Sequence, residues 1–206
     1  MKLLADENFP PMKGKLIVLD GIDGSGKTTQ VKLLKRYLTS KGVPFEVISF
    51  PRYGHNKYTD QIEQYLKGEK SFAPYTIAKA YAGDRMLAKP QIEQWLQEGK
   101  LVIANRYTGS NKAHLDVDLE EDMPEPDLTI LLDVDPKVGQ KNAKKDHKVD
   151  IHEGSLEHQE KAAKIYLEIA ESQPNWVVVN CMQYGKMQNP EKIHQEIVNI
   201  LRRKIF

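Results

Sequence analysis

The chain has 206 residues, of which 40% are hydrophobic and 29% are charged, and its formal net charge is +1. This length fits one α/β domain with enough apolar material for a core, and the near-neutral charge gives no support to a nucleic-acid or membrane partner. Cys181 is the only cysteine, which excludes an internal disulfide and agrees with a reducing cytoplasmic compartment. No apolar run approaches the roughly 20 residues that a membrane-spanning helix needs.

Residues 1–11 are predicted to be an N-terminal extension, and the domain is expected to span residues 12–206. The apolar stretch of the extension is too short, and its charges are too many, for a signal peptide. A terminal strand or a loose tail is the conformation expected of this segment.

Short apolar runs alternate with helical patterns along the rest of the chain. Strands are predicted at Lys15–Asp20, Phe45–Phe50, Lys100–Ala104, Leu128–Val134 and Asn175–Asn180. Helices are predicted at Lys27–Lys41, Lys57–Leu66, Pro74–Gln97, Pro136–Lys145, Ser155–Ser172 and Pro190–Lys204. Strands that alternate with helices favour right-handed crossovers, and continuously apolar strands favour burial on both faces. The sequence therefore predicts an α/β fold with a five-stranded parallel sheet flanked by helices.

The first predicted strand leads into Gly21-Ile22-Asp23-Gly24-Ser25-Gly26-Lys27-Thr28, which matches the phosphate-loop pattern G-x-x-x-x-G-K-[ST] at every defined position. Glycines let a backbone wrap a phosphate, and the helix N-terminus supplies partial positive charge. Lys27 is expected to reach the outer phosphates of ATP, and Thr28 to offer its hydroxyl to Mg²⁺. The residues predicted to bind ATP are Gly21, Gly24, Ser25, Gly26, Lys27, Thr28 and Thr29.

A chance glycine-rich turn is the alternative to a phosphate loop. It is disfavoured because a predicted strand precedes the motif and a predicted helix follows it. The fold is therefore expected to be a three-layer fold of the P-loop NTPase type.

Further polar side chains follow the predicted strands, at the sheet edge where α/β proteins bind ligands. Arg52 and Arg106 could each hold a phosphate through two N–H groups. Tyr81 and Arg85 lie one helical turn apart, so that a ring and a guanidinium could together bind a planar base. The alternatives are that Tyr81 packs in the core and that Arg85 forms a surface ion pair.

Taken in order, these motifs resemble the thymidylate kinase family over nearly the whole chain, from about residue 12 to residue 205. The matching segments are Gly21–Thr28 with an acid at Asp23, Phe50–Tyr53, Tyr81–Arg85, Arg106-Tyr107 with Ser110-Asn111, Pro126–Leu128 and Leu132–Val134. The resemblance implies a phosphotransferase that moves the γ-phosphoryl group of ATP to dTMP, giving ADP and dTDP for dTTP synthesis. It also implies Mg²⁺ as a cofactor, a short lid at about 140–150 and a homodimer formed through packed helices.

The resemblance also implies roles for individual residues. Lys27, Arg106 and Asp23 are expected to be catalytic, and Asp23 also to accept a hydrogen bond from the 3′-hydroxyl of dTMP. The residues expected to bind the acceptor nucleotide are Asp23, Phe50, Arg52, Tyr53, Tyr81, Arg85, Arg106 and Asn111. His114 falls near a position where relatives carry an aromatic residue that excludes a 2′-hydroxyl. Asp150 and Glu153 match acids that lie near the acceptor.

The chain departs from the family pattern at two places. Asn105 stands where relatives carry an aspartate before Arg-Tyr, which removes a metal-linked carboxylate that Asp20 or Asp133 could replace. Gly24 stands where some relatives carry an arginine, and relatives without it usually supply one from the lid. The lid here has only lysines, and the candidates to replace that arginine are Lys141, Lys144, Lys145 and Lys148.

The segment Gln140–Asp150 is expected to be either a mobile lid or a solvated connection, since a lysine-rich run is often simply solvated. At this point two further functions stay open. One is a kinase for another deoxynucleoside monophosphate, because few contacts select the base. The other is a nucleotide-binding protein with weak or no turnover, because of Asn105 and the arginine-free lid.

Overall fold

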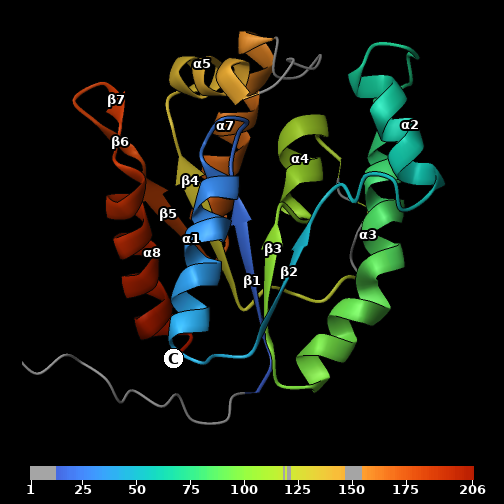
Figure 1. Cartoon of the computed structure of the whole chain (residues 1–206). Helices are drawn as coiled ribbons and strands as arrows, with labels where there is room; N and C mark the ends of the chain where they lie inside the picture. The colour runs from blue at the N-terminus through green and yellow to red at the C-terminus, as the bar shows by residue number, and fades with distance from the viewer. Residues whose placement is uncertain (1–12, 118, 120–121, 147–154) are drawn as a thin grey trace, which may run out of the picture.

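A five-stranded parallel sheet forms the centre of the protein, with the strand order β2-β3-β1-β4-β5 (Figure 1). The computed structural model describes residues 13–117, 119, 122–146 and 155–206. The strands are β1 (Lys15–Asp20), β2 (Phe45–Ser49), β3 (Leu101–Asn105), β4 (Leu128–Asp133) and β5 (Trp176–Asn180). In β1 the run from Leu16 to Asp20 is buried, because helices cover both faces of the sheet. The predicted parallel sheet is confirmed.

Two helix layers enclose this sheet. One face carries α1 (Lys27–Ser40) and α8 (Pro190–Lys204), and the other carries α3 (Pro74–Gln97), α4 (Gly109–Leu115) and α7 (Leu156–Ser172). The remaining helices are α2 (Lys57–Leu66), which packs against α3, and α5 (Pro136–Asp146), which follows β4. None of the helices in the described ranges combines the length and apolarity that a bilayer span requires.

The alternation of side chains along β1 divides the core between the two layers. Leu19 packs with Leu34 of α1 and Ile197 of α8, whereas Val18 packs with Ile92 of α3. Burying apolar side chains in this way stabilises a fold by about 1.5–3 kcal/mol for each large residue. The hydrophobic clusters on the two faces of the sheet hold the carboxyl ends of β1, β3 and β4 at one edge. Predicted site residues come directly after these strand ends in the chain.

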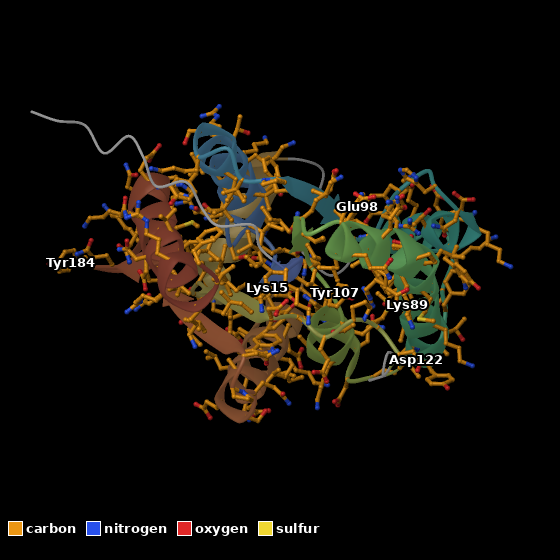
Figure 2. All side chains as sticks on the ribbon, turned by 90° about the horizontal axis from the view of Figure 1, so that it is seen from below. Lys15, Lys89, Glu98, Tyr107, Asp122 and Tyr184 are labelled. Carbon is orange, nitrogen blue, oxygen red and sulfur yellow. The ribbon has the colours of Figure 1, made fainter. Side chains whose placement is uncertain are left out.

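The structure contains elements that the sequence did not predict. Helix α4 is one, and the antiparallel hairpin of β6 (Met182–Gln183) and β7 (Lys186–Met187) is the other. Tyr184 lies at the tip of this hairpin with 94% of its surface exposed, and Figure 2 shows it at the periphery of the molecule. Residues 140–146 continue α5, so this part of the expected lid is helical. The predicted extension, residues 1–11, lies outside the described residues.

Candidate active site

The phosphate loop connects β1 to α1 and depends on glycine at three positions. Gly21, Gly24 and Gly26 have φ angles of +139°, +70° and +90°, in a region that other residues rarely adopt. A Cβ atom at Gly24 would also lie 2.0 Å from the carbonyl oxygen of Gly139, because α5 packs directly on the loop. The loop therefore has no space for a side chain at residue 24 in this arrangement.

Lys27 extends its ammonium group over the same loop. Its Nζ donates to the carbonyl oxygens of Gly21 at 2.9 Å and Ile22 at 2.7 Å, and also lies 3.3 Å from Ser25 Oγ. The side chain is almost fully buried, with 7% of its surface exposed. The loop thus holds a positive charge beside the first N–H groups of α1, where a polyphosphate would bind.

Asp23 and Arg106 form a partly buried ion pair at the centre of the site. The second carboxylate oxygen of Asp23 accepts from Nε2 of Gln159 at 3.0 Å, and the Asp23 N–H donates to Gln159 Oε1 at 3.2 Å. Burial alone would raise the pKa of Asp23, but Arg106, then His114 and Lys27, hold it well below its usual range. Arg106 has a φ of +65°, a strained conformation for a residue with a side chain. Asp23 is therefore an anion, and its position is fixed from two sides.

His114 contacts the Arg106 guanidinium, and His158 in turn contacts His114. Nη1 of Arg106 lies 3.2 Å from Nε2 of His114, and Nδ1 of His114 lies 3.2 Å from Nε2 of His158. Because a guanidinium can only donate, Nε2 of a neutral His114 would accept from Arg106, and its Nδ1 would then donate to His158. Burial lowers the pKa of His158, although Asp23 opposes this effect and Lys161 adds to it. This shift favours the neutral form of the His158 ring.

Two adjoining cavities meet at the ion pair. The first, of about 400 Å³, and the second, of about 330 Å³, share Asp23, Thr28 and Arg106 in their walls. The first cavity runs along the phosphate loop, and its other lining residues are Gly24, Gly26, Lys27, Thr29, Gln30, Asn105, Asn142, Ala143, Met187, Pro190 and Ile193. This arrangement can hold two ligands whose reactive ends face each other across Asp23 and Arg106.

Most residues predicted for the acceptor line the second cavity. They are Asp23, Phe50, Tyr53, Tyr81, Arg85, Arg106 and Asn111, with His114 also in the wall. Arg85 is 1% exposed, and the Asn111 side chain donates to the carbonyl oxygen of Ala78 at 3.1 Å, which ties α4 to α3. The cavity thus combines aromatic rings with buried guanidinium and amide groups, which suits a planar base and an anion.

Arg52 is the exception among these predictions, because it lines neither cavity. Its guanidinium instead binds Asp84 of α3, with Nε 2.9 Å from Asp84 Oδ1 and Nη2 2.7 Å from the Asp84 carbonyl oxygen. Gly21 and Ser25 also lie outside both cavity walls and shape the loop from within. The other residues predicted to bind ATP or the acceptor line at least one of the two cavities.

The oxygen atoms near the loop decide whether a divalent cation fits here. Thr28 lines both cavities, and Asn105 lines the first. Oδ1 of Asn105 is buried and has no hydrogen-bond partner in the described ranges, so this carbonyl oxygen is available as a ligand for a cation. Asp20 and Asp133, considered as replacements for the missing carboxylate, line neither of these cavities. Asp20 instead accepts from Tyr166 and Ser110.

The lysines considered as substitutes for a lid arginine are only partly described. Lys141 and Lys144 are exposed on α5, and Nζ of Lys144 lies 3.3 Å from Gln140 Oε1. The side chain of Lys145 lies outside the described residues, as do Lys148, Asp150 and Glu153. Asn142 of α5 contacts the loop, with Nδ2 3.4 Å from the carbonyl oxygen of Gly24.

Sequence reasoning missed several residues of the site. Gln159 and His158 come from the first turn of α7, and Met187 comes from the unpredicted hairpin. The only local signal was Ser155, a residue type common at helix starts, whose Oγ accepts from the His158 N–H at 3.2 Å. This cap fixes where α7 begins but does not indicate what its first turn contacts.

A glycine-rich loop between the first strand and first helix of a three-layer parallel fold, with two cavities meeting at the loop, defines a P-loop protein of the nucleotide-binding class. Comparison with known proteins is more specific. The family model described as "Thymidylate kinase" matches residues 19–197, and the chain belongs to this family.

Individual relatives agree with this assignment. The chain is 32% identical over 210 residues to a probable thymidylate kinase of Pyrococcus horikoshii, covering 95% of this chain and 99% of the relative. It is 29% identical over 197 residues to a thymidylate kinase of Fervidobacterium nodosum, covering 89% of this chain and 96% of that relative. The thymidylate kinase structure from Candida albicans matches with a TM-score of 0.77 at 20% identity, over 93% of this chain and 92% of that one, which confirms the fold.

Proposed function

We propose that this protein transfers the γ-phosphoryl group of ATP to dTMP, forming ADP and dTDP. The observation that supports this most is the pair of cavities that share Asp23, Thr28 and Arg106, since phosphoryl transfer requires two nucleotides in line. Membership of the thymidylate kinase family supports the identity of the two substrates.

On the donor side, ATP would lie along the first cavity with its phosphates in the loop. Lys27 would exchange its contacts to the carbonyl oxygens of Gly21 and Ile22 for contacts to the outer phosphates. Met187 and Pro190 also line this cavity and would contact the base. The loop N–H groups and Lys27 would then stabilise the charge on the transferring group.

On the acceptor side, dTMP would lie in the second cavity. Phe50 and Tyr81 would hold the thymine, Arg85 would donate to one of its carbonyl groups, and Asn111 would contact the base or sugar edge. Arg106 would hold the acceptor phosphate beside Asp23, which would accept from the 3′-hydroxyl. The ion pair with Asp23 and the contact to His114 would orient the guanidinium before dTMP binds.

The oxygen donors present fit Mg²⁺, which prefers oxygen ligands and keeps several waters. Thr28 and Asn105 would hold it, directly or through those waters, because both residues line the first cavity and Asn105 Oδ1 has no hydrogen-bond partner among the described residues. When bound, Mg²⁺ neutralises charge on the transferred phosphoryl group. Asn105 contributes no negative charge, so we expect weaker metal binding than a carboxylate would give.

We also infer a cytoplasmic homodimer. The family resemblance supports the dimer, and so do the exposed neighbours Met86 and Leu87 on α3, with 40% and 55% of their surfaces exposed. The single buried Cys181 agrees with a reducing compartment.

A coupled assay of ADP release tests the proposal, with ATP, Mg²⁺ and each of dTMP, dUMP, dCMP, dGMP and UMP. We expect dTMP to be preferred, and Lys27→Met to lower kcat/KM at least about 100-fold, while Lys35→Met on the exposed side of α1 has no such effect. A preference for a purine acceptor would contradict the assignment of the second cavity. Binding of both nucleotides without ADP release would favour the alternative of a non-catalytic nucleotide-binding protein.

A further inference from the structure

Asp84 is a buried carboxylate of α3 that lines neither cavity. None of its surface is exposed, yet it accepts several hydrogen bonds from the segment after β2. Oδ1 accepts from Arg52 Nε at 2.9 Å and from Asn56 Nδ2 at 2.7 Å, and Oδ2 accepts from the Arg52 N–H at 2.8 Å. One carboxylate therefore fixes both the backbone and the side chain of Arg52.

These contacts involve only some of the N–H donors of the Arg52 guanidinium. Nε binds the carboxylate and Nη2 donates to the Asp84 carbonyl oxygen at 2.7 Å. Within the described ranges, Nη1 of Arg52 has no hydrogen-bond partner. The guanidinium carbon also lies 6.0 Å from the centre of the Phe50 ring, so Phe50 and Asp84 together hold the group. One edge of Arg52 is thus fixed, and its Nη1 donors stay available for an anion.

The location of Arg52 beside the second cavity indicates which anion its free donors would bind. Phe50, Pro51 and Tyr53, its neighbours in the chain, all line the second cavity. Asn56 caps α2, since its side chain accepts from the N–H groups of Tyr58 and Thr59. Asp84 therefore joins α3, the start of α2 and the wall of the second cavity at one buried point.

We propose that Asp84 is a positioning residue for the acceptor, holding Arg52 so that its remaining donors bind the phosphate of dTMP. This inference rests on the proposed function and adds a residue that touches no substrate. An Arg side chain otherwise loses considerable rotamer freedom when it binds a ligand, and Asp84 has already fixed it. The effect of Asp84 on the acceptor must then pass through Arg52.

A double-mutant cycle tests this dependence, using Asp84→Asn, Arg52→Gln and the combined variant. KM for dTMP is measured at saturating ATP, KM for ATP at saturating dTMP, and Tm for each protein. We expect Asp84→Asn to raise KM for dTMP about tenfold or more, as loss of a charged hydrogen-bonded contact does, and to leave KM for ATP within about twofold. In the Arg52→Gln background the same change should have less than about a twofold effect. The control is Glu93→Gln, a carboxylate-to-amide change at a half-exposed position of the same helix, which should match the wild type.

A merely structural role gives a different result. If Asp84→Asn raises KM for dTMP equally in both backgrounds, or raises both KM values together, the proposal is wrong. If Asp84→Asn alone fails to fold, the combined variant removes both charges and is compared with Arg52→Gln, and a further tenfold loss overturns the proposal. If the wild type forms no ADP with dTMP, the proposed function fails, and the same cycle is read from the Kd of dTMP by calorimetry. If the wild type does not bind dTMP, both the proposed function and the proposed role of Asp84 are wrong.

Discussion

The contact between α5 and the phosphate loop predicts an unusual cost for the change Gly24→Ala. Gly24 has a φ of +70°, which costs a residue with a Cβ about 1–2 kcal/mol. The new Cβ would also lie 2.0 Å from the oxygen and 2.7 Å from the carbon of the Gly139 carbonyl. These are backbone atoms, so α5 must move, and overpacking of this kind costs about 1–3 kcal/mol. We therefore expect Gly24→Ala to lower the free energy of unfolding by about 2–5 kcal/mol.

Gly42 offers a matched control for the backbone part of this cost. Its φ is +65°, and a Cβ there would meet nothing within 4 Å. Gly42→Ala should therefore lose only about 1–2 kcal/mol. Urea unfolding of both variants gives the difference, which is the contribution of the contact with Gly139. Since Asn142 and Ala143 of α5 line the first cavity, Gly24→Ala should also weaken ATP binding, whereas Gly42→Ala should not.

Equal losses of stability in the two variants, with unchanged ATP affinity in both, would refute the packing of α5 on the loop. The same geometry bears on the arginine that some relatives carry at this position. An arginine at residue 24 would meet the same backbone atoms, so Gly24→Arg should destabilise the protein rather than restore a missing contact.

Three further changes have defined outcomes. Asn105→Asp should lower the Mg²⁺ concentration needed for half-maximal activity, because a carboxylate replaces an amide oxygen that has no hydrogen-bond partner among the described residues. An unchanged Mg²⁺ titration would contradict that placement of the metal. Tyr166→Phe should cost about 1–3 kcal/mol in urea unfolding, since its hydroxyl donates to Asp20 at 2.6 Å, whereas exposed Tyr184→Phe should cost nothing. Burial lowers the pKa of His158, so the folded protein keeps this ring neutral while the unfolded chain is protonated below about pH 6.5. The stability should thus fall as the pH drops below that value, and fall less in His158→Gln; an equal fall in both proteins would count against a neutral His158.

Local sequence patterns were sufficient to predict the sheet and the phosphate loop. The strands are short and mostly apolar, and the loop residues are adjacent in the chain, so short-range rules apply to both. Helix α4 escaped prediction because Gly109, Ser110 and Asn111 favour a turn. Its conformation depends on distant contacts: the Ser110 hydroxyl binds Asp20 at 2.9 Å, and Asn111 binds Ala78 at 3.1 Å.

The partners of the charged groups were harder to predict. Asp84 directly precedes Arg85 in the chain, yet the fold pairs it with Arg52, 32 residues away. Gln159 holds Asp23 across a separation of 136 residues. No periodicity or motif contains such pairings, because they arise only when α3 and α7 are packed on the sheet. The identities of the charged residues at the site could therefore be predicted from the sequence, whereas the pairs that they form could be seen only in the structure.

Direct detection of the products tests the central claim, which is that two nucleotides react across Asp23 and Arg106. The protein is incubated with ATP, dTMP and Mg²⁺, and the nucleotides are separated and quantified over time. The account predicts that dTDP and ADP form in equal amounts, and that neither forms without dTMP. ADP released without dTDP, or no product while both nucleotides bind, would contradict it.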